Sequence, residues 1–346
     1  MFLKNLSKML FMFMIWLGTM IVISANSWLG LWMGLEINLL SLIPILTSNN
    51  NLSNSEAALN YFLVQAFASI TLLFSMIMFI ILNNLMFMTL FLNFYMPNKI
   101  ILLSLMMKLG APPFHFWFPN VMENINWNNN FLLMTWQKIG PMMIMNYFIK
   151  FDLLMISFIL LAAFIGSIGG LNQISLRKIM AFSSINHLGW MFSAILYNEN
   201  IWIIYFMIYS FMVMSFIYML KIMKIFYLNQ LYMNFFNNKL LKFLLLSNML
   251  SLGGLPPLLG FFPKWIIIQS LSYMNLNLMI LFLICMSMIT LYYYLKIMFS
   301  AIMFNYMELN FFYFMFTSKM IMFTILITNF MSIFSFFLMI NLIFFI

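Results

Sequence analysis

Two stretches of the sequence carry the same interruption: Leu109-Gly-Ala-Pro-Pro-Phe-His-Phe-Trp-Phe-Pro119 and Gly253-Gly-Leu-Pro-Pro-Leu-Leu-Gly-Phe-Phe-Pro-Lys264. Both lie in long apolar runs, and they share the pattern Gly-x-Pro-Pro-x-x-x-(Trp/Phe)-Phe-Pro. Because proline has no backbone N–H to donate, each pattern predicts a helix that breaks within the run. Paired breaks in the two halves of an apolar chain are typical of inverted-repeat transport proteins. The predicted helix-breaking residues are Gly110, Pro112, Pro113, Gly254, Pro256 and Pro257.

The composition excludes a soluble protein. Of the 346 residues, 66% are hydrophobic and 6% are charged, whereas a soluble domain carries about 25% charged residues. With a mean hydropathy of +1.06, we expect an all-α polytopic membrane protein, since its backbone must be satisfied within lipid. The net charge of +9 has no polar basic surface to act through, so no nucleic-acid partner is expected. The single cysteine, Cys285, excludes a disulfide framework and a thiolate metal cluster.

A helix needs about 20 apolar residues to cross the hydrocarbon, and the sequence offers about eleven such runs in a single membrane domain, residues 1–346. Polar clusters separate many of them, Asn128-Asn129-Asn130 among these. No cleavable signal peptide is expected, because the first apolar run leads into a tight turn and another span. The expected spans are residues 8–25, 27–46, 56–82, 98–119, 128–149, 152–171, 177–196, 200–224, 240–271, 274–304 and 319–344.

The loop charges predict the orientation, because Lys and Arg collect on the side that is not translocated. Only Lys99 and Lys150 lie on one side. On the other side lie Lys4, Lys8, Arg177, Lys178, Lys221, Lys224, Lys239, Lys242, Lys296 and Lys319. The N-terminus is therefore expected on the positive side and the C-terminus, after an odd number of spans, on the opposite side.

The positions of the two broken spans predict internal repeats. They are the fourth and the ninth, so they are expected to cross the membrane in opposite directions. This predicts two inverted repeats of five helices, residues 8–149 and 152–304, followed by a final transmembrane helix, residues 319–344.

Charged side chains inside the expected spans are costly, at roughly 2.5–3.5 kcal/mol each on insertion scales, and so call for a reason. Glu36, in the second span, is interpreted as a proton carrier or as the counter-ion of a buried lysine. The alternative is a protonated, hydrogen-bonded structural carboxyl. Lys108 precedes the first break, where the freed carbonyls form the negative end of a half-helix. It is interpreted as a group that loads and releases a proton, the alternative being a lysine that only caps the broken helix.

Two further lysines and two histidines lie in the same apolar environment. Lys138, in Trp136-Gln-Lys-Ile-Gly-Pro141, is interpreted as functional, against the alternative of a lysine that snorkels to the interface. Lys264, after Pro263 in the second break, is also interpreted as functional. His115 and His187 are candidate proton relays, and for both the reading of a structural hydrogen-bonding side chain stays open.

No phosphate-binding loop, cysteine cluster or dinucleotide fingerprint occurs in the sequence. We therefore expect no redox cofactor on this chain and no bond chemistry by it alone. One carboxylate, three lysines and two histidines near mid-membrane favour proton movement, with internal water as a partner.

Long motifs in the sequence resemble the subunit 2 family of mitochondrial NADH:ubiquinone oxidoreductase, respiratory complex I, in its shortened animal form. That family is similar to antiporters but lacks the first three helices, which leaves eleven. The resemblance extends over nearly the whole chain. The motifs that carry it are Trp28-Leu-Gly-Leu-Trp-Met-Gly-Leu-Glu-Ile-Asn38, the two broken stretches, Thr135-Trp-Gln-Lys138, and Ser175-Leu-Arg-Lys-Ile-Met-Ala-Phe-Ser-Ser-Ile-Asn-His-Leu-Gly-Trp190.

The resemblance implies a proton pump driven by quinone reduction elsewhere in the complex. The family's glutamate and three lysines correspond to Glu36, Lys108, Lys138 and Lys264. NADH, FMN, iron–sulfur clusters and ubiquinone are implied in other subunits, with none on this chain. Other membrane-arm subunits and membrane lipids are implied partners, cardiolipin being a candidate. The implied location is the mitochondrial inner membrane, with the N-terminus on the matrix side and the C-terminus on the intermembrane-space side.

Two alternatives stay open at this point. A stand-alone cation/proton antiporter shares the expected fold and most of the motifs. A hydrophobic spacer that only holds the membrane arm together explains the apolar composition, but it leaves the cost of the embedded charges unexplained.

Overall fold

The structure is a computed structural model that describes residues 2–47, 51–83, 95–148, 153–234 and 239–303, together with Thr324, Leu326, Asn329 and Phe330. Within these ranges the regular elements are helices, apart from one isolated bridge between Ser175 and Tyr227. The helices gather into two compact units, Met1–Met155 and Ile156–Ile346.

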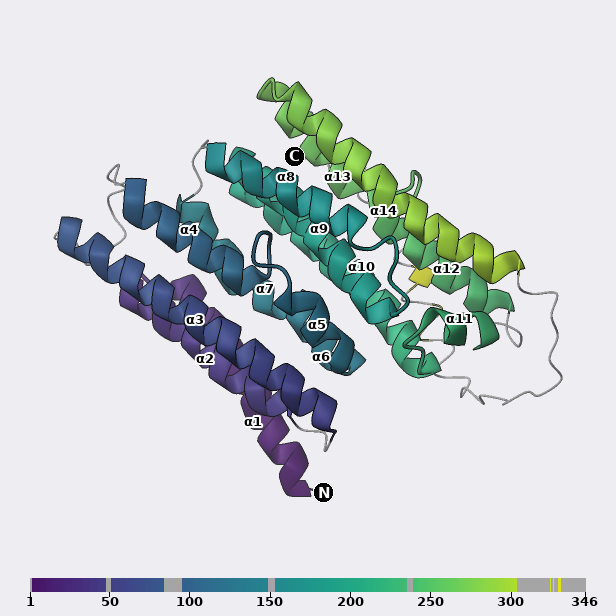
Figure 1. The fold of residues 1–346 in the computed structure, drawn as a ribbon, viewed down its shortest axis with the longest axis horizontal. Helices are drawn as coiled ribbons and strands as arrows, with labels where there is room; N and C mark the ends of the chain where they lie inside the picture. The colour runs from purple at the N-terminus through teal and green to yellow at the C-terminus, as the bar shows by residue number, and fades with distance from the viewer. Residues whose placement is uncertain are drawn as a thin grey trace. The chain divides into compact units, whose positions relative to one another are not determined.

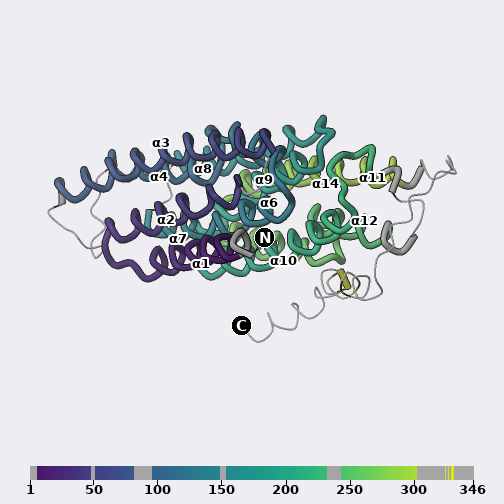
Figure 2. Tube along the Cα trace, turned by 90° about the horizontal axis from the view of Figure 1, so that it is seen from below, coloured from purple at the N-terminus to yellow at the C-terminus, as the bar shows by residue number. Residues whose placement is uncertain are grey.

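Helix α7 forms the centre of the first unit, because it contacts α1, α2, α4 and α6. Helix α3 packs against α2, α4 and α5. Within this unit, α3 and α4 lie on one side and α1, α2 and α7 on the other (Figure 2). The helices, labelled in Figure 1, are α1 (Phe2–Ser24), α2 (Trp28–Leu46), α3 (Leu52–Asn83), α4 (Tyr95–Leu109), α5 (Trp117–Asn124), α6 (Trp127–Met134) and α7 (Trp136–Phe148).

Helix α9 forms the centre of the second unit and contacts α10, α13 and α14. Every residue from Ser183 to Ile195 is buried, so this segment has no face directed outward. The helices that follow α7 are α8 (Leu153–Ile168), α9 (Leu176–Tyr197), α10 (Glu199–Met223), α11 (Leu228–Asn234), α12 (Lys239–Gly253), α13 (Phe261–Tyr273) and α14 (Asn277–Met303).

Six helices in the described ranges are long and apolar enough to cross a membrane. They correspond to the first, second, third, seventh, eighth and tenth expected spans, and α8 is a shorter apolar helix. The expected span 319–344 lies outside the described residues, except for four positions. The six segments are Leu6–Ser24, Trp28–Leu46, Leu52–Ile81, Leu176–Tyr197, Glu199–Met223 and Asn277–Ala301.

The expected span 128–149 is divided in the structure. Its first part is α6, and Thr135 ends that helix with φ −116° and ψ −72° before α7 begins. The asparagines expected to separate two spans are helical instead. They bond outward: Asn129 Nδ2 donates to the Ile45 carbonyl at 3.1 Å and Asn130 Nδ2 to the Met122 carbonyl at 3.1 Å. Asn129 and Asn130 are therefore buried inside the helical fold, where they donate to these carbonyls, and do not form a loop between spans.

Candidate functional site

The first Gly-Pro-Pro stretch ends α4 at Leu109, and α5 begins at Trp117. Gly110 adopts φ +68°, in the left-handed region that glycine enters without steric cost. The turn folds back on the helix end, because the N–H of Ala111 donates to the Met106 carbonyl at 3.0 Å. A helix therefore stops within the apolar run, as the sequence predicts.

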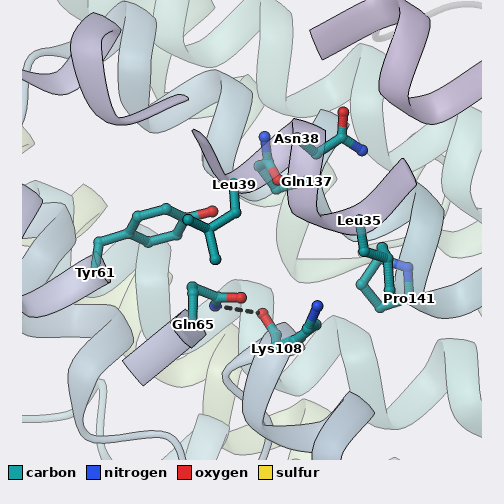
Figure 3. A pocket seen from close by; sticks show the side chains of 8 residues that line it. All are labelled: Leu35, Asn38, Leu39, Tyr61, Gln65, Lys108, Gln137 and Pro141. Carbon is teal, nitrogen blue, oxygen red and sulfur yellow. Dashed lines mark hydrogen bonds between the residues drawn. The ribbon is translucent and has the colours of Figure 1, made fainter. Parts of the chain in front are cut away.

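Lys108, one residue before the end of α4, is buried with 8% of its surface exposed. Its carbonyl accepts a hydrogen bond of 3.1 Å from Nε2 of Gln65 on α3. The preceding carbonyl, that of Met107, accepts one of 3.2 Å from Nε1 of Trp117. The Lys108 ammonium points away from its own carbonyl and into a small cavity (Figure 3).

The cavity is polar and lies among α2, α3, α4 and α7. It has room for about one water molecule. Two of its lining residues carry a buried polar atom with no hydrogen-bond partner among the described residues, Asn38 at Oδ1 and Gln137 at Nε2. Its lining residues are Leu35, Asn38, Leu39, Tyr61, Gln65, Lys108, Gln137 and Pro141.

Glu36 is half-buried on α2, next to the cavity-lining Leu35. Its Oε2 atom is buried and has no hydrogen-bond partner among the described residues. It lies within electrostatic range of Lys108 and of the hydroxyl of Tyr61. The structure thus brings the carboxylate and the first lysine together in one unit.

Lys138 lies on α7 in the same unit and is only 1% exposed. Its Nζ atom is 5.6 Å from the centroid of the Phe118 ring, within the range of a cation–π contact. A side chain this deeply enclosed does not reach an aqueous interface, which counts against the snorkelling alternative. Phe118 also packs on Gly110, so the first break and Lys138 share an aromatic neighbour.

His115 lies inside the first break, and its ring packs on that of Phe116 with 4.2 Å between centroids. It is buried but is not among the residues that line the cavity. Its position therefore does not join it to the Lys108 cavity.

The second Gly-Pro-Pro stretch separates α12 from α13, and Gly254 adopts φ +83°. Lys264, in the first turn of α13, is 5% exposed. Its Nζ atom donates a hydrogen bond of 2.8 Å to the Gly253 carbonyl, at the end of α12. It also lies 5.9 Å from the centroid of the Trp190 ring. Lys264 thus connects the start of α13 to the end of α12 across the break.

His187 belongs to a cluster of buried hydroxyl and imidazole groups in the second unit. Its Nδ1 atom is 2.7 Å from the hydroxyl oxygen of Tyr205, and its ring centroid is 4.8 Å from that of Tyr209. Tyr293 and Tyr294 are also buried in this unit, with 4.6 Å between their ring centroids. The structural hydrogen-bonding reading of His187 therefore has a defined partner.

The sequence reasoning missed several polar residues of both units. Gln65 is one of few polar side chains in a long apolar run, and this signal would have found it. The four tyrosines gave no such signal, because tyrosine is common at membrane interfaces. Only the folded chain shows that they are buried beside a histidine.

The class of protein follows from the family comparison: residues 25–290 match the family described as "NADH:quinone oxidoreductase/Mrp antiporter, TM". A chain of respiratory complex I from Thermus thermophilus has a similar fold, with a TM-score of 0.84 and 22% identity. That match covers 95% of this chain and 78% of the other. A chain of the Mrp complex from Dietzia gives a TM-score of 0.73 at 14% identity, over 82% and 58%.

Two curated relatives give the particular family. NADH-ubiquinone oxidoreductase chain 2 of Anopheles gambiae is 49% identical over 309 residues, 88% of this chain and 89% of the relative. The protein of the same name from Bos taurus is 37% identical over 295 residues, 83% of each. The chain belongs to the NADH-ubiquinone oxidoreductase chain 2 family of antiporter-like membrane proteins, and the resemblance seen in the motifs is confirmed.

Proposed function

We propose that this chain is a proton-translocating core subunit in the membrane arm of respiratory complex I. In this role it couples NADH-to-ubiquinone electron transfer, carried out in other subunits, to proton pumping across the inner mitochondrial membrane. The observation that carries the proposal is the buried Lys108, which faces a polar cavity within electrostatic reach of Glu36. Buried ionisable groups in membrane proteins are functional candidates by default, because burying a charge is energetically unfavourable.

In the proposed mechanism Glu36 modulates the proton affinity of Lys108. Protons then pass among Lys108, Lys138 and Lys264, with internal water and His115 or His187 as relays. The burial of all three lysines supports this route, since each is at most 8% exposed. A lysine enclosed in this way exchanges its proton only with groups that reach it inside the protein.

The architecture that we propose has eleven membrane spans in two inverted five-helix repeats, residues 8–149 and 152–304, and a last helix at 319–344. The occurrence of two compact units that divide near residue 155 supports this division. So does the matching left-handed glycine at each break, at Gly110 and Gly254. We place the N-terminus in the matrix and the C-terminus in the intermembrane space, on the bias of the loop charges.

The redox groups of the reaction belong, in this proposal, to other subunits: FMN, the iron–sulfur clusters and the sites of NADH and ubiquinone. The chain contributes its helices to a hetero-oligomeric membrane arm and is surrounded there by lipid, with cardiolipin as one candidate. The names of its relatives support this assignment.

The test is a Lys108→Met variant in the assembled complex. Methionine nearly keeps the length of the side chain and removes the charge, so we expect a lower ratio of protons pumped to electrons transferred. The ratio is measured in sealed membrane vesicles from proton uptake and NADH oxidation. Lys221→Met is the matched control, because Lys221 is exposed at the end of α10. An unchanged ratio in the Lys108→Met complex would overturn the proposal.

A second candidate function, a stand-alone cation/proton antiporter, is favoured by the fold shared with the Mrp complex chain. Purification from the native membrane separates the two. A monomer that exchanges Na⁺ for H⁺ would support the antiporter, whereas co-purification with NADH oxidation activity supports the complex I subunit.

A further inference from the structure

The two helix breaks face the same physical problem. A helix that ends leaves its last carbonyls without intrahelical donors, and in a membrane bulk solvent does not supply them, so each unpaired carbonyl is costly. A nearby lysine is a natural remedy, because cations are favoured at the negative end of a helix and charge-assisted hydrogen bonds are strong. Each break has a lysine within reach.

The second break uses this remedy. Lys264 Nζ donates to the Gly253 carbonyl at 2.8 Å, so the ammonium is committed to the backbone. Gly254 makes room for it: a Cβ atom at this position would lie 2.8 Å from the same Nζ atom.

The first break solves the problem without its lysine. The Gln65 amide donates to the Lys108 carbonyl, and the Trp117 indole donates to the Met107 carbonyl. The Met106 carbonyl is occupied by the N–H of Ala111. Three consecutive carbonyls at the end of α4 thus have donors, none of which is an ammonium.

The side chain of Lys108, unlike that of Lys264, does not cap a helix end. It points away from the backbone that Gln65 caps and enters the cavity (Figure 3). Gln65 is itself 5% exposed and lines the same cavity, so its amide reaches the Lys108 carbonyl from within the protein. The neutral amide of Gln65 thus occupies the Lys108 carbonyl. The ammonium of Lys108 is therefore not needed to cap it.

We propose that Gln65 is a positioning residue for Lys108: by capping the Lys108 carbonyl it keeps the ammonium of that lysine in the cavity and off the end of its own helix. The inference rests on the proposed function, since it concerns how the proton-carrying lysine is held. Without the amide, the orphaned carbonyl competes for the ammonium, and Lys108 takes on the capping role that Lys264 has in the second break.

Gln65→Met in the assembled complex tests the inference. Methionine has nearly the same length and lacks the N–H donor, so the complex should assemble and oxidise NADH when uncoupled. We expect its proton-to-electron ratio to fall to that of Lys108→Met and no lower. Ser69→Ala is the matched control: Ser69 lies one turn further along α3, is 3% exposed, and its hydroxyl donates only to its own helix. This variant should keep the full ratio.

A double variant separates positioning from general structural support. If Gln65 acts through the ammonium, Gln65→Met adds nothing once Lys108→Met is present, because coupled residues are not additive. A further loss in the double variant, or a full ratio in Gln65→Met beside a reduced ratio in Lys108→Met, would overturn the inference. A full ratio in Lys108→Met instead removes the proposed function, so the two failures are distinguishable.

Gln65→Glu keeps the test decisive if the methionine variant does not assemble. A protonated carboxyl donates to the Lys108 carbonyl as the amide does, whereas an ionised one cannot donate and attracts the ammonium. The ratio in this variant should therefore be highest at low pH and fall as pH rises, relative to the parent complex at each pH. A ratio equal to that of the parent, at a pH where the infrared band of the introduced carboxylate shows it to be ionised, contradicts the inference.

Discussion

A single torsion angle decides what Gly254 can tolerate. At φ +83° an L-residue with a Cβ atom is strained by roughly 1–2 kcal/mol, and the added methyl would also press on Lys264 Nζ. We expect Gly254→Ala to displace the ammonium from the Gly253 carbonyl and to lower the proton-to-electron ratio. Gly253→Ala is the control, since its Cβ would meet nothing closer than 3.5 Å. Equal ratios in the two alanine variants would refute this explanation.

The hydroxyl of Tyr205 is the partner of His187 Nδ1 in the second unit. Tyr205→Phe keeps the buried ring and removes this hydrogen bond, so we expect a loss of stability of about 1–3 kcal/mol. The measurement is the midpoint of thermal inactivation of the solubilised complex. Tyr197→Phe serves for comparison, because Tyr197 is 42% exposed. A midpoint unchanged by Tyr205→Phe would show that the hydrogen bond contributes nothing.

At the level of helices, the junction of α5 and α6 depends on one buried amide. Asn130 is fully buried, and its Nδ2 atom donates to the carbonyls of Met122 and Ile125 at 3.1 and 3.4 Å. Asn130→Leu leaves both carbonyls without this donor and is expected to cost about 1–3 kcal/mol, seen as lower abundance of the assembled complex. Asn128→Ala, an exposed neighbour in the same asparagine run, should change stability by less than about 0.5 kcal/mol.

The long apolar helices could be predicted because their signal is local. Apolar runs predicted α1, α2, α3, α9, α10 and α14, and the Gly-Pro-Pro pattern predicted where α4 and α12 end. The division of 128–149 into α6 and α7 could not be predicted, because Asn129 and Asn130 find their partners in other parts of the fold. The asparagine run is equally compatible with a loop, so the sequence alone does not distinguish the two structures.

The candidate site divides along the same line. Glu36 and the lysines stand out from their apolar surroundings as single charges, so composition alone selects them. The role of Gln65 depends on α3 lying beside the end of α4, which is a contact between residues far apart in the sequence. Tertiary structure likewise determines whether the lysine at a break caps the helix end. Lys264 does so at the second break, whereas Lys108 does not at the first.

For the whole molecule, the spacer alternative makes a prediction of its own. A chain with Glu36→Gln and methionine at positions 108, 138 and 264 carries no embedded charge at these sites. Each removed charge saves roughly 2.5–3.5 kcal/mol of insertion cost, so we expect the helices to insert at least as well as before. A spacer would leave the proton-to-electron ratio unchanged, whereas we expect it to fall. The assembled complex, quantified beside its NADH oxidation rate, is the control for integrity.

The hydrogen bond from Lys264 to the Gly253 carbonyl makes a proposed proton-carrying lysine part of the support of a helix end. Proton binding at Lys264 and the conformation of the helix end are then thermodynamically linked, and such linkage is reciprocal. If a rearrangement of the break weakened proton binding at Lys264 tenfold, departure of that proton would favour the rearrangement tenfold, by about 1.4 kcal/mol. In the first break, where neutral donors hold the helix end, this direct linkage is absent. The two breaks share one sequence pattern, yet they differ in whether proton binding by the neighbouring lysine acts directly on the helix end.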